Sequence, residues 1–201
     1  MAEEPVEVAE QPHEEESEAP RLDPEVEARR SAAMSFIKRL GDPVLKSRAT
    51  PVDHFDDALR GQVARMAGLM DDALGIGLAA PQLGVSQRLL VYRVGPDAPL
   101  IALANPEIEW HSDDQDVLEE GCLSLPGVQM DIERPLYVRV RARDEHGDER
   151  VVEASGLEAR VIQHEMDHLD GVLILDRGSR EQRKEAMRAI REAEERRERA
   201  A

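Results

Sequence analysis

The stretch that decides the fold is QHEMDH at residues 163–168. Residues four positions apart share one face of a helix, so His164 and His168 can reach one metal ion with Glu165 beside it. The single cysteine of the chain, Cys122, lies upstream in EGCLS at residues 120–124. One thiolate and two imidazoles leave one open position on a tetrahedral metal, which is typical of catalytic sites. The pattern predicts a metal-dependent hydrolase.

An alternative to a metal site is an exposed amphipathic helix whose histidines bind and release protons but hold no metal ion. Leu157, Val161, His164 and His168 recur at i, i+4, i+7 and i+11, so the histidines continue an apolar stripe toward the interior. Gly171 supplies a helix stop. A buried imidazole pair needs partners, and a metal ion provides them. The sequence therefore favours a buried helix with a metal site.

Composition and charge narrow the class of protein. The chain has 201 residues, of which 41% are hydrophobic, enough for one core of ordinary size. A single cysteine excludes an intramolecular disulfide and fits a reducing compartment. No apolar run approaches the roughly 20 residues of a membrane span. The net charge of −17 argues against direct DNA binding. We expect a cytoplasmic protein without a membrane partner.

The chain divides into three parts. Residues 1–33 hold ten Glu, one Asp and three Arg, a net charge of −8, and are expected to be an acidic disordered N-terminal extension. They resemble neither a secretory signal nor a transit peptide. Met34 begins the first foldable sequence, so translation starting at Met34 and a genuine acidic tail both stay open. Residues 34–178 are expected to form the catalytic domain and residues 179–201 a charged C-terminal helix.

Within the catalytic domain the patterning predicts an α+β fold. A helix is expected over residues 55–73, where apolar residues recur at helical spacing: Leu59, Val63, Met66, Met70 and Leu74. Strands are expected over 88–94, 100–105, 136–143 and 150–154, the last two as an antiparallel hairpin. We predict antiparallel β-sheets around a central helix that carries the His-Glu-x-x-His motif, plus a C-terminal helix. That last helix is either simply solvated or a docking helix for a larger partner.

A third motif, GIGLAAPQ at residues 75–82, is needed to interpret the cysteine motif and the histidine motif together. Its glycines let the backbone approach a ligand closely, and Gln82 offers an amide donor. Alone it would be an unremarkable glycine-rich loop. In order along the chain, GIGLAAPQ, EGCLS and the histidine motif resemble the three signature motifs of peptide deformylases. The resemblance runs from about Met34 to Arg177 and includes GDPVL at residues 41–45.

The resemblance implies a function and roles for individual residues. The reaction would remove the N-formyl group from the formylmethionine of nascent polypeptides and release formate. Glu165 would be the general base and then the general acid, while the Gln82 amide and the Leu123 N–H would stabilise the oxyanion. Cys122, His164 and His168 would be the metal ligands, and Glu120 and Arg134 would form an ion pair supporting the site. The implied substrate-binding residues are Gly75, Ile76, Gly77, Leu118, Leu125, Leu157 and Val161.

The resemblance also implies a cofactor and partners. One divalent ion is expected, Fe(II) in the cell, with Zn(II), Ni(II) or Co(II) able to occupy the site. The thiolate suits ferrous iron and brings sensitivity to oxygen. The partners would be formylated N-termini of nascent polypeptides, and the C-terminal helix is a candidate contact with the ribosome. Gln129 stands where many family members place a larger basic or aromatic residue near the substrate rim.

Two other functions are compatible with parts of the sequence. A metallopeptidase would share the histidine motif but cleave internal peptide bonds. A non-catalytic homologue that binds nascent chains or ribosomes would be expected to have lost at least one site residue, whereas Gln82, Cys122, Glu165 and both histidines are present. His13, His54, His111 and His146 lie outside the motifs and are expected at the surface.

Overall fold

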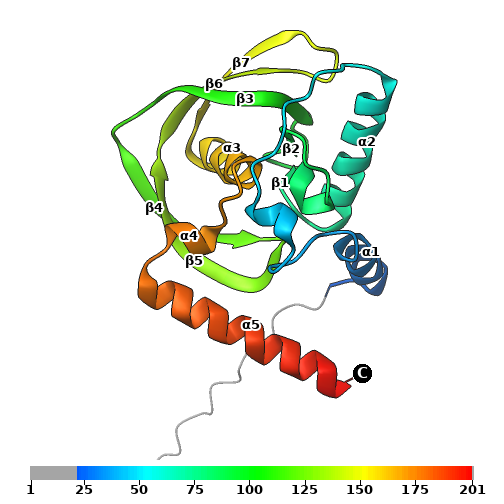
Figure 1. Cartoon of the computed structure of the whole chain (residues 1–201), viewed down its shortest axis with the longest axis vertical. Helices are drawn as coiled ribbons and strands as arrows, with labels where there is room; N and C mark the ends of the chain where they lie inside the picture. Colours follow the sequence, from blue (N-terminus) through cyan, green and yellow to red (C-terminus); the bar gives the residue numbers. More distant parts are fainter. Residues whose placement is uncertain (1–21, 201) are drawn as a thin grey trace, which may run out of the picture.

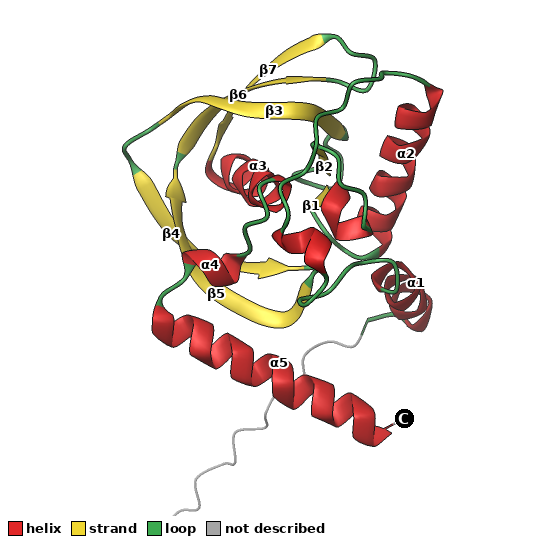
Figure 2. Cartoon of the chain, viewed as in Figure 1, coloured by secondary structure: helices red, strands yellow, loops and turns green. Residues whose placement is uncertain are grey.

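The histidine-bearing helix α3 (Gly156–Leu169) lies at the centre of the molecule, with strands around it (Figures 1 and 2). This computed structural model describes residues 22–200; residues 1–21 and 201 lie outside the described part. One antiparallel sheet has the order β1 (Gly77–Ala79), β2 (Leu89–Tyr92), β3 (Ile101–His111), β6 (Tyr137–Arg143), β7 (Glu149–Ser155). The other is a hairpin of β4 (Gln115–Cys122) and β5 (Leu125–Pro135). The predicted α+β fold, with antiparallel sheets around a central helix, is confirmed.

Burial on more than one face explains the central position of α3. Val161, Ile162, Met166 and Leu169 are buried in one apolar cluster with side chains of β2, β3 and β6. A helix that is apolar on several faces is stable only when it is enclosed. Gly171 follows the helix end with φ +72°, and a Cβ there would lie 2.8 Å from the carbonyl carbon of Lys46. Only glycine fits this turn without displacing the backbone.

Helix α2 (Asp57–Asp72) covers another side of the core and matches the predicted helix closely. Asp56 caps it by accepting a hydrogen bond from the Leu59 N–H at 3.1 Å. Four of the five predicted core residues, from Leu59 to Met70, are buried. Leu74 was expected to continue this stripe, but it lies beyond the helix end with φ +59° and is exposed. The turn that ends α2 points Leu74 out of the core.

The strands also extend beyond the prediction. The β6–β7 hairpin forms as expected, with Val140 opposite Val152. Strand β3 continues past the predicted end at residue 105 to His111, with register shifts against β6. The long β4–β5 hairpin was not predicted as a unit, although its alternating burial along β5 is regular. This hairpin matters because β4 ends at Cys122.

The two ends of the described chain are helical. Residues 24–33 were expected to be disordered, but α1 (Pro24–Met34) forms a helix there, so that expectation is corrected. Asp23 caps it, Pro24 fills its first position, and Ala33 and Met34 are buried. Residues 1–21 of the expected extension lie outside the described residues. The overlooked signal was the Asp23-Pro24 pair, a common helix start.

The C-terminal helix α5 (Arg180–Ala200) runs along the outside of β5 (Figure 1). It contacts the core through a thin stripe of Ala186, Met187 and Ile190. Short helices complete the chain: η1 (Pro43–Lys46), η2 (Ala80–Leu83) and α4 (Ile174–Arg177). None of the helices within residues 22–200 is long and apolar enough to cross a membrane.

Candidate active site

Two elements bring the predicted metal ligands together. Cys122 ends β4, and His164 and His168 project from α3. One ligand atom of each residue lies within 4.8 Å of those of the other two. The Cys122 Sγ is 3.3 Å from the His168 Nε2. A thiolate with two imidazoles at this spacing fits a single divalent ion of the iron or zinc type.

The electrostatics of these ligands also suit a cation. Burial would raise the pKa of the Cys122 thiol, but the charges and hydrogen bonds of His168 and His164 outweigh it, so the pKa is lowered well below its ordinary value. Burial would likewise lower the pKa of His164, yet its hydrogen bonds to Cys122 and Glu120 raise it. Both shifts report strong attraction between a thiolate and positive charge. A bound metal ion would supply that charge with neutral imidazoles.

Glu165 is buried beside the ligands, with only 4% of its surface exposed. Burial raises the pKa of its carboxyl group, which makes the carboxylate a stronger base. Its Oε2 has no hydrogen-bond partner within the described part of the chain. A buried carboxylate oxygen without a partner is costly, and it is the group expected to accept a proton from a substrate or water.

Gln82 is fixed so that its amide N–H faces the ligands. It is 1% exposed, and its Oε1 accepts a hydrogen bond from the Ala79 N–H at 2.9 Å. Its Nε2 donates to the Ser124 Oγ at 3.3 Å and lies 3.8 Å from the Cys122 Sγ. Because the backbone holds the amide oxygen, the nitrogen side must face the metal ligands. Leu123, the other predicted oxyanion donor, directly follows Cys122 and lines the same cavity.

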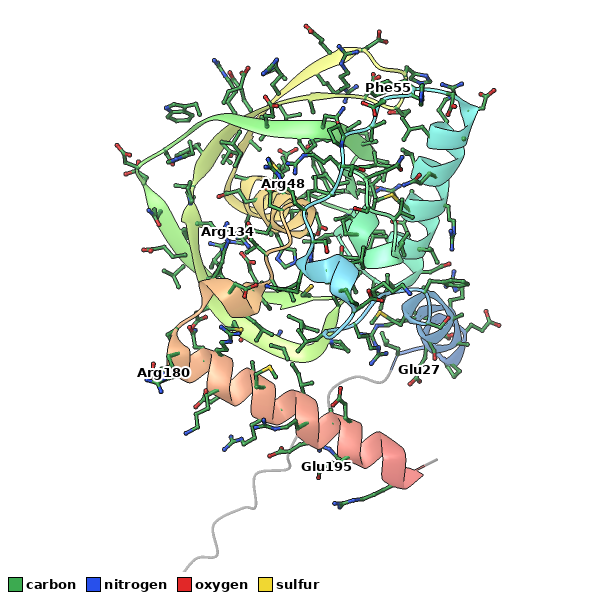
Figure 3. All side chains as sticks on the ribbon, in the orientation of Figure 1. Glu27, Arg48, Phe55, Arg134, Arg180 and Glu195 are labelled. Atoms are coloured by element: carbon green, nitrogen blue, oxygen red, sulfur yellow. The ribbon has the colours of Figure 1, made fainter. Side chains whose placement is uncertain are left out.

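The predicted pair of Glu120 and Arg134 belongs to a buried charge network. Arg134 is labelled in Figure 3. Arg134 donates to both oxygens of Glu120, at 2.6 and 2.8 Å, and Arg160 donates to Oε1 at 2.8 Å. The Glu120 Oε2 lies 2.9 Å from the His164 Nδ1. Burial would raise the pKa of Glu120, but the hydrogen bonds from Arg134 and His164 lower it far below its ordinary value. The ionised Glu120 thus orients His164, one of the predicted metal ligands.

Part of this network was missed by the sequence analysis. Asp167 accepts hydrogen bonds from Arg134 at 2.9 Å and from Arg177 at 2.5 Å, which links α3 to α4. Arg160 also donates to the carbonyl oxygens of Ile132 and Asp116. Its position four residues before His164, on the same helix face, was the signal that could have identified it.

A cavity of about 590 Å³ opens beside the ligands. Six of the seven predicted substrate-binding residues line it: Gly75, Ile76, Gly77, Leu125, Leu157 and Val161. Leu118 is not among the lining residues and is 45% exposed, so its assignment to the substrate stays a prediction. Apolar lining residues that were not predicted are Met34, Leu74, Pro126 and Val128.

The chain is similar to known proteins over most of its length. The family model described as polypeptide deformylase matches residues 34–184. A peptide deformylase of Parafrankia sp. is 49% identical over 158 residues, which are 79% of this chain and 86% of that protein. The crystal structure of a peptide deformylase from Legionella pneumophila matches with TM-score 0.76 at 39% identity, covering 79% of this chain and 94% of that one. One from Synechococcus elongatus, in complex with actinonin, matches with TM-score 0.73 at 44% identity, covering 78% and 86%.

Proposed function

The chain belongs to the peptide deformylase family, and from this premise we propose which residues carry the reaction and which metal it uses. As a member of that family it is a metal-dependent amide hydrolase that removes the N-formyl group from nascent polypeptides. The proposal concerns the residues and the ion. The observation that carries it is the buried Glu165 carboxylate, one oxygen of which has no partner among residues 22–200 and lies beside Cys122 and the two histidines.

Cys122, His164 and His168 would hold the ion, which we assign as Fe(II) in the cell, with Zn(II), Ni(II) or Co(II) as substitutes. The support is the donor set, since one thiolate with two imidazoles suits these borderline cations. When bound, the ion supplies Lewis acidity that activates water and polarises the formyl carbonyl. The Glu120 carboxylate keeps His164 oriented toward the ion.

Glu165 moves the proton in both halves of the reaction. Its carboxylate accepts a proton from water as the water oxygen adds to the formyl carbon. It then returns that proton to the amine nitrogen as the carbon–nitrogen bond breaks, which leaves formate and a free amino terminus. Burial supports this role because it raises the pKa of Glu165 toward the range of an effective general base.

Gln82 and Leu123 stabilise the negative charge on the formyl oxygen. The Gln82 Nε2 is held in place by the bond between its Oε1 and the Ala79 N–H. The Leu123 N–H follows the ligand Cys122 directly. Donors fixed before the reaction need no reorganisation during it, and loss of one typically costs about 10²–10³ in rate.

The cavity accommodates the substrate next to these groups. We assign Gly75, Ile76 and Gly77 to pairing along the peptide backbone, because this segment leads into strand β1 at the cavity wall. Leu125, Leu157 and Val161 are assigned to the methionine side chain, since they are apolar and line the same cavity. The small formyl group then lies beside Glu165.

Substrates of this enzyme emerge from the ribosome, so we place its action in the cytoplasm and assign α5 to ribosome contact. The sequence of this helix is net positive in a chain with net charge −17, and Arg188 and Arg191 are outside its buried stripe. Co-sedimentation of the full chain with ribosomes tests the assignment. A variant with Arg188→Glu and Arg191→Glu should bind less, and equal binding would refute it.

The decisive experiment measures formate release from formyl-Met-Ala-Ser. The protein is purified anaerobically with iron and compared with its Glu165→Ala variant. Formate from the parent and little from the variant is the expected result. Formate from neither, with metal verified in the site, would favour a non-catalytic module that binds nascent chains. Cleavage of unformylated Met-Ala-Ser would instead favour a metallopeptidase.

A further inference from the structure

Helix α1 forms part of the wall of the substrate cavity although most of it lies outside the family match, which begins at residue 34. Arg30 and Met34 of this helix line the cavity that also contains Cys122 and Glu165. Ala33 and Met34 anchor the helix, because both are buried in the cluster formed with α2. Residues 24–33 therefore add a wall that the matched domain alone does not contain.

The lining residues separate into a buried end and an exposed mouth. Glu165 is buried at one end, whereas Arg30, Ile76 and Leu157 are exposed to solvent. A formylated peptide whose reacting group lies beside Glu165 must extend through this mouth, because the rest of the chain continues into solvent. The residues that follow the formylmethionine therefore pass the exposed lining residues, Arg30 among them.

The two arginines that line the cavity differ in their free donors. Arg160 is buried and already donates to Glu120, Ile132 and Asp116. The Arg30 guanidinium is exposed and makes no hydrogen bond or ion pair with the residues described, 22–200. Within the described part of the chain, all five of its N–H donors are left for a ligand. Arg30 is thus a cation without a partner there, at the mouth of the cavity.

We propose that Arg30 is a specificity-determining residue that binds an acidic side chain in the first few residues after the formylmethionine. A guanidinium matches a carboxylate with two parallel hydrogen bonds. The chain as a whole, at net charge −17, repels acidic peptides, so a local cation at the mouth decides whether they are accepted. This inference rests on the deformylase reaction proposed above.

Glu119, which lines the same mouth from β4, sets the opposing preference. It is exposed and, like Arg30, has no ion pair among residues 22–200. Its carboxylate attracts basic side chains and repels acidic ones. Removal of this charge in Glu119→Gln should therefore strengthen the preference for acidic peptides, the opposite of a change at Arg30.

The test compares formylated peptides that differ only in charge. Formyl-Met-Asp-Ser and formyl-Met-Lys-Ser, and the pair formyl-Met-Ala-Asp and formyl-Met-Ala-Lys, are made as C-terminal amides to remove the terminal carboxylate. The ratio of kcat/KM for acidic over basic peptides is measured for the full-length parent, Arg30→Ala and Arg30→Glu. Arg29→Glu is the matched control, because Arg29 is also an exposed residue of α1 but does not line the cavity.

At least one peptide pair should show a ratio that falls about two- to fivefold in Arg30→Ala and further in Arg30→Glu. The change should reside in KM and shrink at high salt, because the contact is exposed. Arg29→Glu should leave the ratio unchanged. Equal shifts in Arg29→Glu and Arg30→Glu, or a constant ratio in Arg30→Glu on both pairs, would overturn the inference. Those results leave the proposed function standing, because that function is tested separately by formate release from the parent and from Glu165→Ala.

Discussion

Gly77 lies directly against the carboxylate of Glu165. A Cβ added to Gly77 would overlap the Glu165 Oε1 and lie 2.9 Å from its Cγ and Cδ. Gly77 opens strand β1, and Glu165 belongs to the central helix α3, so two separate elements meet at this contact. The absence of a side chain at Gly77 leaves room for the carboxylate of Glu165, the proposed general base.

Alanine at Gly77 should therefore displace Glu165. The carboxylate is buried and has little room to move, so we expect kcat for formate release to fall about 100-fold, as for other displacements of about 1 Å. Gly121→Ala is the control in the same cavity, because a Cβ there would meet only the Val128 carbonyl oxygen at 3.8 Å. Similar kcat values for both variants would contradict this explanation.

Glu120→Gln should weaken metal binding. The substitution preserves shape but removes the charge that orients His164 and balances the buried Arg134 and Arg160. Loss of such a contact typically lowers metal affinity about 10–100-fold. Competition with a chelator measures the metal affinity. Glu119→Gln, a change at the exposed neighbouring residue, which makes no hydrogen bond or ion pair with His164 within residues 22–200, should bind metal like the parent. Equal affinities for both variants would exclude the orienting role.

Gly171→Ala should destabilise the fold. The residue has φ +72°, and a Cβ would lie 2.8 and 2.9 Å from the Lys46 carbonyl carbon and oxygen, which are backbone atoms. We expect the free energy of unfolding to fall by about 1–3 kcal/mol. Urea denaturation measures it. Gly68→Ala, in the exposed interior of α2 with nothing within 4 Å, should instead raise stability by about 0.5–1 kcal/mol.

Asp176 should contribute stability that depends on pH. Burial would raise the pKa of its carboxyl group, but hydrogen bonds from Lys46 at 2.6 Å and from the Leu173 N–H at 2.8 Å outweigh it and lower the pKa. A carboxyl group with a lowered pKa in the folded state stabilises above its unfolded pKa, and this contribution is lost as pH falls through the folded pKa.

Asp176→Ala should therefore lower the free energy of unfolding by about 1 kcal/mol at pH 7. The difference from the parent should shrink as the pH falls below about 4. Urea denaturation across this range measures it. Asp113→Ala serves as control, because the exposed Asp113 side chain has no partner within residues 22–200. A difference for Asp176→Ala that stayed constant with pH would refute the assignment.

Air should inactivate the iron-loaded enzyme. Cys122 is only partly buried, and its lowered pKa favours the thiolate, the form that oxidises. Zinc has no redox chemistry, so the zinc-loaded protein should keep its activity over the same storage. Formate release measured after aerobic and anaerobic storage checks both forms. Iron-loaded protein that retained full activity in air would show this prediction to be wrong.

Local spacing was enough to predict that the two histidines of the motif lie together. His164 and His168 are four residues apart on one helix, so their common face follows from helical geometry alone. Alternation along 136–143 was likewise enough to predict β6, with Val138 and Val140 buried. The failures fall where spacing does not show where an element ends. Leu74 continues the helical spacing of α2, yet it lies beyond the helix end and is exposed.

The residue types and their spacing along single elements were enough to predict the chemical groups of the site: a thiolate, two imidazoles and a carboxylate base. The residues that surround these groups could be identified only from the way distant elements pack together. Arg160 and Asp167 join the Glu120 network because α3 packs against the β4–β5 hairpin, and Arg30 reaches the cavity because α1 packs against α2. Periodicity identifies the buried face of an element, but the packing of distant segments determines what that face contacts.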